Sequence, residues 1–461
     1  MQNELQSFER IAQLLIEKEQ SEPVVTPIPA KDLWNTLDLK LNPEGLEDEQ
    51  FEHLLTQVVL STPRTSTRKF FNQLFGGRSP KATLGDLLAV MLNNSMYTYK
   101  VAGPQVGVEK AILKEIIRLI DYPEQADGTI ASGGSMSNLI AMLMARDKAD
   151  PGAREHGITK KLMAYTSEAS HYSIPKNAAF IGLGRGHVTK IPTNAFGQMD
   201  PVALAHTMEL HAQEGFVPFF VNATAGTTVL GAFDPINAIA NVCKKYDSWL
   251  HVDGAYCGSV IFSDTYKKLV NGLELADSFN LNAHKMMGTP LTCSIIVVKD
   301  KKYLHASLSN EAEYLYQTDA DEFNLGKTSL QCGRRNDALK FWSLWKSVGT
   351  NGLQTIVDKQ FDLATIARNY VEQHPDYTVY SYPDSISICF NYKGISAKTL
   401  CTGLYESSEL LVGFGTFNQE TFVRMVTINP NNNPEDILAF FETLEAYVAQ
   451  NELTLKSPTL S

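Results

Sequence analysis

Short apolar runs alternate with helix-start signals between about residues 76 and 345, and this alternation most constrains how the chain folds. Asp200-Pro201 and Asp234-Pro235 each place an aspartate at a helix N-cap and a proline at the first helical position. Strands that alternate with helices favour a mainly parallel sheet with helices on both faces. The sequence therefore predicts an α/β fold. The runs with the length of buried strands are Leu162–Tyr165, Phe216–Val221, Trp249–Val252 and Ser294–Val298.

The regions on either side have a different character. The first 75 residues contain helical patches interrupted by a proline-containing run, which predicts an N-terminal helical arm that packs on something else. The last 116 or so combine helical and strand-like segments, which predicts a small α+β domain. We therefore expect three parts: an N-terminal helical arm at 1–75, a large domain at 76–345 and a small C-terminal α+β domain at 346–461.

Composition and charge exclude several classes of protein. The chain has 461 residues, 44% of them hydrophobic and 20% charged, which is typical of a globular protein with more than one core. The net charge of −11 and the lack of a basic run argue against a nucleic-acid surface. No apolar stretch approaches the ~20 residues of a membrane helix, no secretion signal begins the chain, and no histidine spacing is typical of a metal site. The six scattered cysteines contain no C-x-x-C pair. We expect a cytoplasmic protein with reduced thiols, no membrane or nucleic-acid partner and no metal.

Two charged residues follow strand-like segments and carry the strongest chemical signal. Lys285 comes after residues 277–282, and Asp253 ends the run Trp249–Val252. A lysine amine forms a Schiff base with the aldehyde of pyridoxal phosphate (PLP), and a buried carboxylate keeps the pyridine nitrogen protonated so that the ring accepts electrons. Burial beside a cationic His284 or the cofactor is expected to depress the pKa of Lys285. Either residue alone is more commonly an ordinary surface charge.

Other segments supply parts that the same cofactor needs. Gly134 and Ser135 precede a helical run, where free N–H groups form a phosphate cradle, although many helices begin with such caps. His171 follows a predicted strand at the edge where open α/β sheets bind ligands. It either stacks on a flat ring or is an ordinary hydrogen-bonded loop residue. Thr224 offers a hydroxyl to the ring substituents or to a local turn. Ala255 is small enough for a ring to lie flat against it.

The glycine loop, the histidine, the aspartate and the His-Lys pair, in that order, resemble the fold-type I PLP enzymes. Their strings are similar to those of the group II amino-acid decarboxylases, in the branch of glutamate, cysteine-sulfinate and aspartate decarboxylases. Asn282–Ser294 has NAHKMMGTPLTCS where family members have NPHKMMGVPLQCS. The resemblance runs from about residue 60 to about residue 450. Further matching strings are FFNQLF at 70–75, YTY at 97–99, QCGRR at 331–335, KFW at 340–342 and FVRMV at 422–426.

The resemblance implies a fold-type I PLP-dependent transferase-like fold and decarboxylation of an amino acid. It makes Lys285 the Schiff-base lysine, pairs Asp253 with the pyridine nitrogen, and places His171 and Ala255 on the two faces of the ring. It also implies a homodimer with active sites at the interface, in which the segment 307–327 reaches the neighbour's cofactor. The resemblance assigns the phosphate to Gly134, Ser135 and His284, with Asn282 nearby, and the substrate carboxylate to Gln73 and Arg424. For Arg424 a structural ion pair is the alternative.

Three residues depart from the family pattern, and the change at 323 has the largest consequence for the reaction. Ala283 replaces a proline, Thr292 replaces a glutamine, and Phe323 stands where glutamate decarboxylases have a tyrosine thought to protonate Cα. The cysteine-sulfinate branch also lacks that tyrosine, and the Arg334-Arg335 pair resembles that branch too. KMMG resembles the glutamate branch instead, so the assignment is split and we rank glutamate slightly ahead of aspartate and cysteine sulfinate. Decarboxylation of diaminobutyrate or an aromatic amino acid, an aldehyde-forming oxidative reaction, a transaminase or lyase, and a catalytically silent PLP-fold binding protein remain the alternatives.

Overall fold

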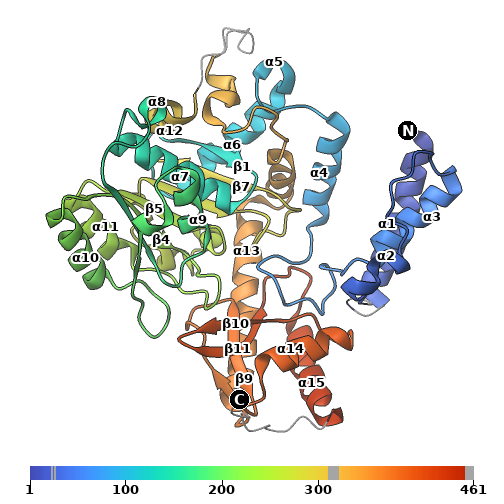
Figure 1. Ribbon diagram of the computed structural model, residues 1–461. Helices are drawn as coiled ribbons and strands as arrows, with labels where there is room; N and C mark the ends of the chain where they lie inside the picture. The colour runs from blue at the N-terminus through green and yellow to red at the C-terminus, as the bar shows by residue number, and fades with distance from the viewer. Residues whose placement is uncertain (22–23, 25–26, 310–320, 452–461) are drawn as a thin grey trace. The chain divides into compact units, whose positions relative to one another are not determined.

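The structure is a computed structural model that describes residues 1–21, 24, 27–309 and 321–451 (Figure 1). The chain divides into two compact units. The first comprises Met1–Gly77, Thr365–Val379 and Ile388–Ser461, and the second Arg78–Ala364 and Tyr380–Ser387. The three-part division at residues 75 and 345 stays a prediction.

The second unit contains the larger sheet. Its helices are α4 (Pro80–Leu92), α5 (Tyr99–Ala102), α6 (Pro104–Leu119), α7 (Gly134–Ala149), α8 (Ala153–His156), α9 (Ser173–Phe180), α10 (Pro201–Gln213), α11 (Ile236–Lys245), α12 (Lys301–Leu308) and most of α13 (Ala338–Gln373). Its strands are β1 (Asp127–Ala131), β2 (Leu162–Ser167), β3 (Val188–Ile191), β4 (Val217–Thr224), β5 (Trp249–Gly254), β6 (Ser278–Asn282) and β7 (Ser294–Val298).

These seven strands form one mainly parallel sheet, as the sequence predicts. The strand order is β1-β7-β6-β5-β4-β2-β3. Pairing is parallel from β6 to β3, whereas β7 runs antiparallel to both of its neighbours, β1 and β6. The bounds of β7 equal the predicted run, but the apolar pattern gave no sign that this strand is reversed.

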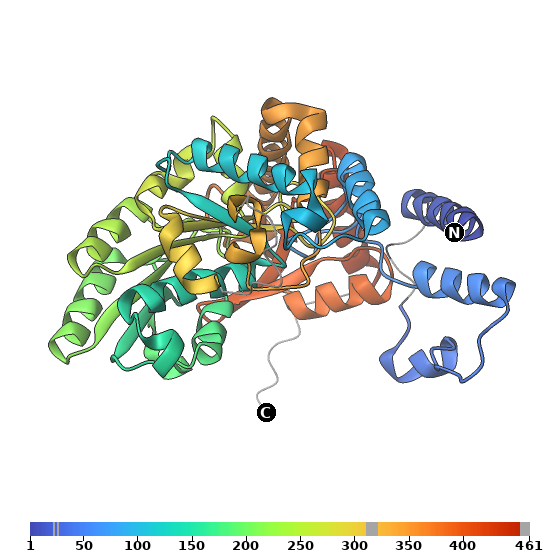
Figure 2. The same ribbon diagram turned by 90° about the horizontal axis from the view of Figure 1, so that it is seen from above.

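Helices cover both faces of this sheet (Figure 2). On one face, Ile296 of β7 packs in a cluster with Ile140 of α7. On the other, a Cβ added at Gly128 would meet the side chains of Leu113 on α6 and Val297 on β7. Successive residues of a strand point to opposite faces, so a strand covered on both sides is apolar along its whole length.

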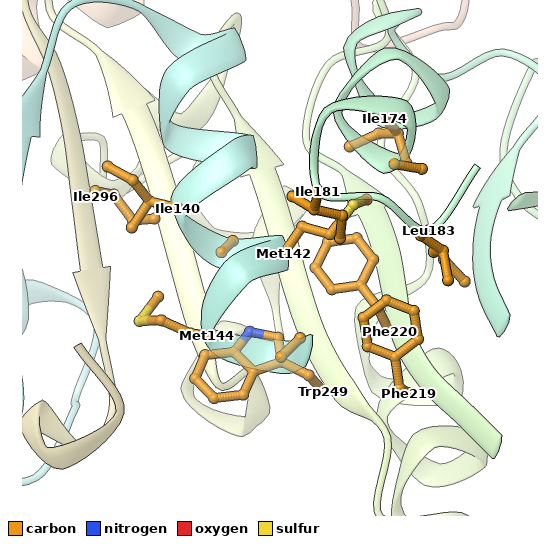
Figure 3. Close-up of a cluster of buried hydrophobic side chains, with 14 of the residues drawn as sticks. Ile140, Met142, Met144, Ile174, Ile181, Leu183, Phe219, Phe220, Trp249 and Ile296 are labelled. Carbon is orange, nitrogen blue, oxygen red and sulfur yellow. The ribbon is translucent and has the colours of Figure 1, made fainter. Parts of the chain in front are cut away.

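The core between α7 and the sheet is built from large apolar side chains (Figure 3). Met142 and Met144 of α7 are fully buried in it, together with Phe220 of β4 and Trp249 of β5. Burial of such a side chain stabilises a fold by roughly 1.5–3 kcal/mol. This packing fixes the position of α7, whose first residue is Gly134 of the predicted phosphate cradle.

Only one of the two predicted Asp-Pro helix starts has the expected geometry. Asp200 accepts hydrogen bonds from the N–H groups of Val202 and Ala203 and caps α10, which is confirmed. Asp234 is not a cap, because α11 begins after Pro235. Its carboxylate instead accepts from the N–H groups of Met199 and Thr224. Those N–H groups lie in a buried loop and at a buried strand end, where an unpaired donor costs more than an uncapped helix.

The first unit holds a smaller sheet with strand order β10-β11-β9-β8. Its 70s segment is tied to the C-terminal part of the chain, since Phe71 donates its N–H to the carbonyl of Leu411 and accepts from the N–H of Val426. The ring of Phe71 also meets that of Phe440 at 5.0 Å between centroids. The elements are α1 (Gln2–Ser21), α2 (Leu33–Thr36), α3 (Asp48–Leu60), the end of α13, β8 (Tyr377–Val379), most of β9 (Ser387–Tyr392), α14 (Ala397–Glu406), β10 (Gly413–Phe417), β11 (Glu420–Val426) and α15 (Pro434–Gln450).

Candidate active site

The carboxyl ends of three neighbouring parallel strands bring most of the predicted site residues together. Thr224 ends β4 and lies opposite Asp253 of β5 in the strand register. Asn282 ends β6, which pairs with β5. Because ligands bind at this edge of open α/β sheets, convergence here has a chemical meaning. It supports one shared site in the second unit.

Asp253 is buried but retains acceptor capacity. Its Oδ2 accepts from Nδ2 of Asn138 at 2.8 Å, and its Oδ1 accepts from the N–H of Ala255 at 3.0 Å. A carboxylate offers about four acceptor positions. A pyridine N–H therefore has a place to donate, and a buried anion needs such a cationic partner.

His171 and Lys285 lie in the electrostatic neighbourhood of Asp253. Burial lowers the pKa of His171, the charge of Lys285 lowers it further, and the charge of Asp253 opposes both. Nδ1 of His171 accepts from the N–H of Ser173 at 3.2 Å. Nζ of Lys285 lies 6.0 Å from the centroid of the Tyr256 ring. A neutral imidazole, an amine and a carboxylate are thus gathered at one place.

The start of α7 requires glycine at its first position. A Cβ added to Gly134 would lie 2.9 Å from Cβ of Ala255 and 3.1 Å from Nδ2 of Asn282. Ser135 follows and is exposed. The N–H groups in the first turn of a helix have no partner within that helix and attract anions. The close approach therefore joins a helix N-terminus to the residues predicted to contact the ring and the phosphate.

A cationic His284 was one of two expected influences on Lys285, the cofactor being the other, and the surroundings of His284 disfavour that charge. Burial and the nearby charge of Lys285 lower its pKa to about 4, so the imidazole is neutral at pH 7. Its Nδ1 lies 2.8 Å from the N–H and 3.0 Å from the carbonyl oxygen of Cys293, so the backbone of Cys293 fixes the orientation of the ring. His284 is buried and lies next to a lysine, and both conditions disfavour the charged imidazole. The sequence does not show how deeply this loop is buried.

The side chains of Asn282 and His284 lie within hydrogen-bond distance of one another. The hydroxyl of Ser294 donates to Oδ1 of Asn282 at 2.5 Å, which turns the Asn282 Nδ2 toward Nε2 of His284, 3.4 Å away. An amide nitrogen carries two protons, so Nδ2 of Asn282 can also donate to an acceptor beside this pair. A phosphate oxygen is such an acceptor, so the donor set fits the phosphate of PLP without a cationic histidine.

Gln73 and Arg424 belong to the first unit. Nη2 of Arg424 donates to the carbonyl of Asn72 at 3.0 Å, so the guanidinium lies against the backbone next to Gln73. Gln73 is exposed and Arg424 is half-buried. Arg424 thus contacts the residue that precedes Gln73, and a shared substrate role for the two side chains stays a prediction.

Phe323 packs in a small apolar cluster. It lies against buried residues that include Met96, Val106 and Leu325, and its ring is 5.6 Å from that of Tyr99. The segment 307–327 was predicted to reach a neighbouring subunit's cofactor, and residues 310–320 of it lie outside the described part of the chain.

Several polar residues at the site had no role assigned from the sequence. Asn138, His251 and Ser278 are buried and lie behind Asp253, and Ser294 orients Asn282. One signal was available, because Ser278, Asn280 and Asn282 alternate with apolar residues along β6. In a strand buried on both faces, such an alternation marks one polar side.

The described residues lack two further features. No group of three or more His, Cys, Asp or Glu side chains there has the arrangement to hold a metal ion. No helix in the same residues combines the length and apolar character needed to cross a membrane.

Comparisons with known proteins agree with this geometry. Residues 32–393 match the family described as the pyridoxal-dependent decarboxylase conserved domain. The chain is 34% identical over 439 residues to the acidic amino acid decarboxylase GADL1 of Xenopus tropicalis, which covers 90% of this chain and 86% of that protein. It is 37% identical over 366 residues to human cysteine sulfinic acid decarboxylase, covering 78% and 74%. The crystal structure of mouse CSAD in apo form superposes with a TM-score of 0.92 at 33% identity, covering 96% of this chain and 98% of the other.

Proposed function

The chain belongs to the pyridoxal-dependent decarboxylase family and is a PLP-dependent amino-acid decarboxylase, and on that premise we propose that it releases the α-carboxyl group of a small acidic L-amino acid as CO2. The observation that carries the site assignment is the position of Asp253. Its buried carboxylate has spare acceptor capacity. The charges of both Asp253 and Lys285 act on the pKa of His171, so the three residues lie near one another.

Each side chain has one task in the proposed reaction. When bound, PLP supplies an electron-accepting ring that stabilises the charge left at Cα after CO2 departs. Asp253 holds a proton on the pyridine nitrogen, and Lys285 provides the amine that carries the cofactor between turnovers. Loss of CO2 is favoured where the carboxylate is desolvated and its bond to Cα is held perpendicular to the ring.

The remaining residues hold and orient. His171 presents a neutral imidazole to one face of the ring, and Ala255 allows close contact on the other. The start of α7 at Gly134 and Ser135 binds the phosphate together with Asn282 and His284. Thr224 donates or accepts at a ring substituent. These assignments are supported by the convergence of the strand ends and by the helix N-terminus beside them.

The acidic class of substrate is supported by the relatives rather than by a bound molecule. Both GADL1 and cysteine sulfinic acid decarboxylase are named for acidic or sulfinic substrates. A guanidinium such as that of Arg424 binds both oxygens of a carboxylate or sulfinate. The rank order that places glutamate slightly ahead of aspartate and cysteine sulfinate stays a prediction.

The test is release of CO2 from L-glutamate, L-aspartate, L-cysteine sulfinate, L-diaminobutyrate and L-tyrosine with added PLP. We expect kcat/KM to be highest for an acidic substrate and at least ~30-fold lower for tyrosine, because a neutral side chain leaves a partly buried guanidinium without its anion at a cost of about 2–5 kcal/mol. A preference for tyrosine or diaminobutyrate would overturn the acidic class and leave the decarboxylase assignment in place.

A second candidate reaction follows from Phe323, which carries no hydroxyl to return a proton to Cα. In it, the same site consumes O2 and water and converts the amino acid to an aldehyde, CO2, ammonia and hydrogen peroxide. The same assays decide between the two reactions, since amine formation without peroxide supports simple decarboxylation.

We further propose that the active enzyme is a homodimer. The inner face of α4 is formed by small buried residues, Ala82, Gly85 and Ala89, whereas its outer residues are large, apolar and exposed. Leu84 and Met91 are each 54% exposed and Leu88 is 50% exposed. Contiguous apolar surface of this kind marks an interface, and a second copy of the chain is the occupant that the relatives' family implies.

A further inference from the structure

A chain of buried polar side chains lies behind Asp253 and has no part in the proposed reaction itself. Nδ2 of Asn138 donates to Oδ2 of Asp253, and Oδ1 of Asn138 lies 3.1 Å from Nε2 of His251. Nδ1 of His251 lies 2.8 Å from Oγ of Ser278, and the same oxygen lies 2.8 Å from Nε1 of Trp249. The five side chains come from α7, β5 and β6 and are all buried.

The two ends of this relay fix the direction of each hydrogen bond. The indole Nε1–H of Trp249 can only donate, so Oγ of Ser278 accepts from it and directs its own proton to Nδ1 of His251. Burial lowers the pKa of His251 to about 4, so its ring is neutral at pH 7 and carries its single proton on Nε2. At the other end the carboxylate of Asp253 can only accept.

Asn138 is the link that meets the carboxylate, and its contacts leave it little freedom. Its second Nδ2 proton goes to Oγ of Ser173 at 3.0 Å, and its Oδ1 also receives Nδ2 of Asn280 at 3.3 Å. Rotation of the amide would place a donor against His251 and an acceptor against Asp253. A fully satisfied buried network of this kind holds one geometry.

Trp249 anchors the far end in the apolar core. Its ring lies in the cluster beside Met144, with the indole nitrogen visible in Figure 3. Because the relay begins in packed core and ends at the carboxylate, the position of Asp253 is coupled to the packing of α7 on the sheet.

We propose that Trp249, Ser278, His251 and Asn138 are positioning residues that hold Asp253 in the orientation that keeps the pyridine nitrogen of PLP protonated. The inference rests on the proposed role of Asp253. The relay ends in a neutral amide, so it orients the carboxylate without supplying a cation. The negative charge of Asp253 therefore stays available to the pyridinium.

Loss of the relay has a specific expected signature. Without its partner on Oδ2, the carboxylate of Asp253 samples other orientations and the pyridine nitrogen is protonated for less of the time. We expect kcat to fall about ten-fold and KM to change little. Loss of a residue that orients a metal ligand lowers activity by about 10–100-fold, and the expected effect is at the lower end of that range.

The test uses the holoenzyme loaded with PLP labelled with 15N in the ring. Two variants interrupt the relay: His251→Phe keeps a flat ring but removes both nitrogens, and Ser278→Ala removes only the hydroxyl. Ser259→Ala is the matched control, because Ser259 is also buried and its hydroxyl has no hydrogen-bond partner among the described residues. We expect both relay variants to move the 15N chemical shift of the ring toward the unprotonated value, and the control to leave it unchanged.

Each result has a distinct meaning. If His251→Phe binds PLP and keeps the wild-type 15N shift and kcat, the relay does not position Asp253; if that variant fails to fold, Ser278→Ala decides by the same readout. Asp253→Asn distinguishes failure of the relay from failure of the role proposed for Asp253. A ring nitrogen that stays protonated in Asp253→Asn overturns the role of Asp253 itself. In histidine-labelled apoenzyme, a proton on Nδ1 of His251 would contradict the direction of the relay.

Discussion

At the residue scale, burial acts in opposite directions on the groups of the site. The carboxylate of Asp253 accepts two N–H hydrogen bonds and can accept a further one from a cation. Burial lowers the pKa of the imidazoles of His171, His251 and His284. The site therefore presents neutral histidines, one lysine and one fixed anion. That combination suits a ring that must itself carry the positive charge.

Lys285→Ala should abolish the visible absorbance that PLP acquires when it is linked to the enzyme, together with nearly all CO2 release. The reason is that no other amine is assigned to that link. Lys301→Ala is the control, since Lys301 is an exposed lysine at the start of α12. A Lys285→Ala enzyme that keeps both the absorbance and the activity would remove the lysine from the mechanism.

Asp253→Asn should still bind PLP but lose several orders of magnitude in kcat. An amide stabilises a pyridinium charge poorly and cannot hold the ring protonated. Equilibrium binding of PLP and single-turnover CO2 release measure the two effects separately. A kcat close to wild type would show that Asp253 does not touch the ring.

The depressed pKa of His284 makes the apoenzyme sensitive to acid. In the unfolded chain this histidine takes up a proton below about pH 6.5, whereas the folded form resists until about pH 4. Its contribution is complete above pH 6.5 and is lost as the pH falls toward 4, by about 3 kcal/mol in total. His284→Gln should therefore flatten the fall in the free energy of unfolding between pH 7 and 4.5, measured with urea at one protein concentration. Equal pH slopes in the two proteins would contradict the burial argument.

At the scale of elements, the start of α7 is held against β5 and β6 with no room for a side chain. Gly134→Ala should weaken PLP binding ten-fold or more, because its Cβ would press on Ala255 and on the Nδ2 of Asn282. Gly152→Ala is the control, since that glycine has ordinary backbone angles and a Cβ there meets only His156 at 3.6 Å. Titration of apoenzyme with PLP measures the dissociation constant. Equal affinity in both variants would show that the phosphate lies elsewhere.

The elements that could be predicted from the sequence are those with a continuous apolar signal. Ser294–Val298 was found with its bounds, and β2, β4 and β5 were found with their C-terminal ends cut short, because each continues into polar residues at the site. β1 was missed, since Asp127–Ala131 has one large apolar residue and is recognisable only by its pairing with β7. The reversed direction of β7 depends on that pairing and on β6, which no local pattern reports.

The same limit explains what was missed in the site. Lys285, Asp253 and Gly134 stand next to strand or helix ends, so position along the chain indicated them. Asn138 and His251 act through contacts between α7 and β5 that are 113 residues apart in sequence. The state of His284 depends on how deeply its loop is buried, which the sequence around it does not reveal.

At the scale of the whole molecule, the exposed apolar residues of α4 predict how the assembly responds to charge. Leu88→Glu should shift the protein from dimer to monomer, because a carboxylate at a buried interface is costly to desolvate. Leu275→Glu is the control, on a 46% exposed leucine in the 3-10 turn Leu273–Leu275. Sedimentation velocity measures the mass, and CO2 release measures activity. A wild-type protein that is monomeric and fully active at high dilution would overturn the dimer.

The division of the chain into two units that share four connections also bears on biosynthesis. The first unit needs both ends of the polypeptide, since the carbonyl of Asn72 is bonded by Arg424, which is made 352 residues later. At translation rates of 5–20 residues per second, the N-terminal segment waits roughly 20 to 70 s for that partner on the ribosome. The second unit is nearly complete by then. The emerging N-terminal helices, with Leu5 and Phe8 about half exposed even in the finished fold, are thus natural clients for a chaperone during synthesis.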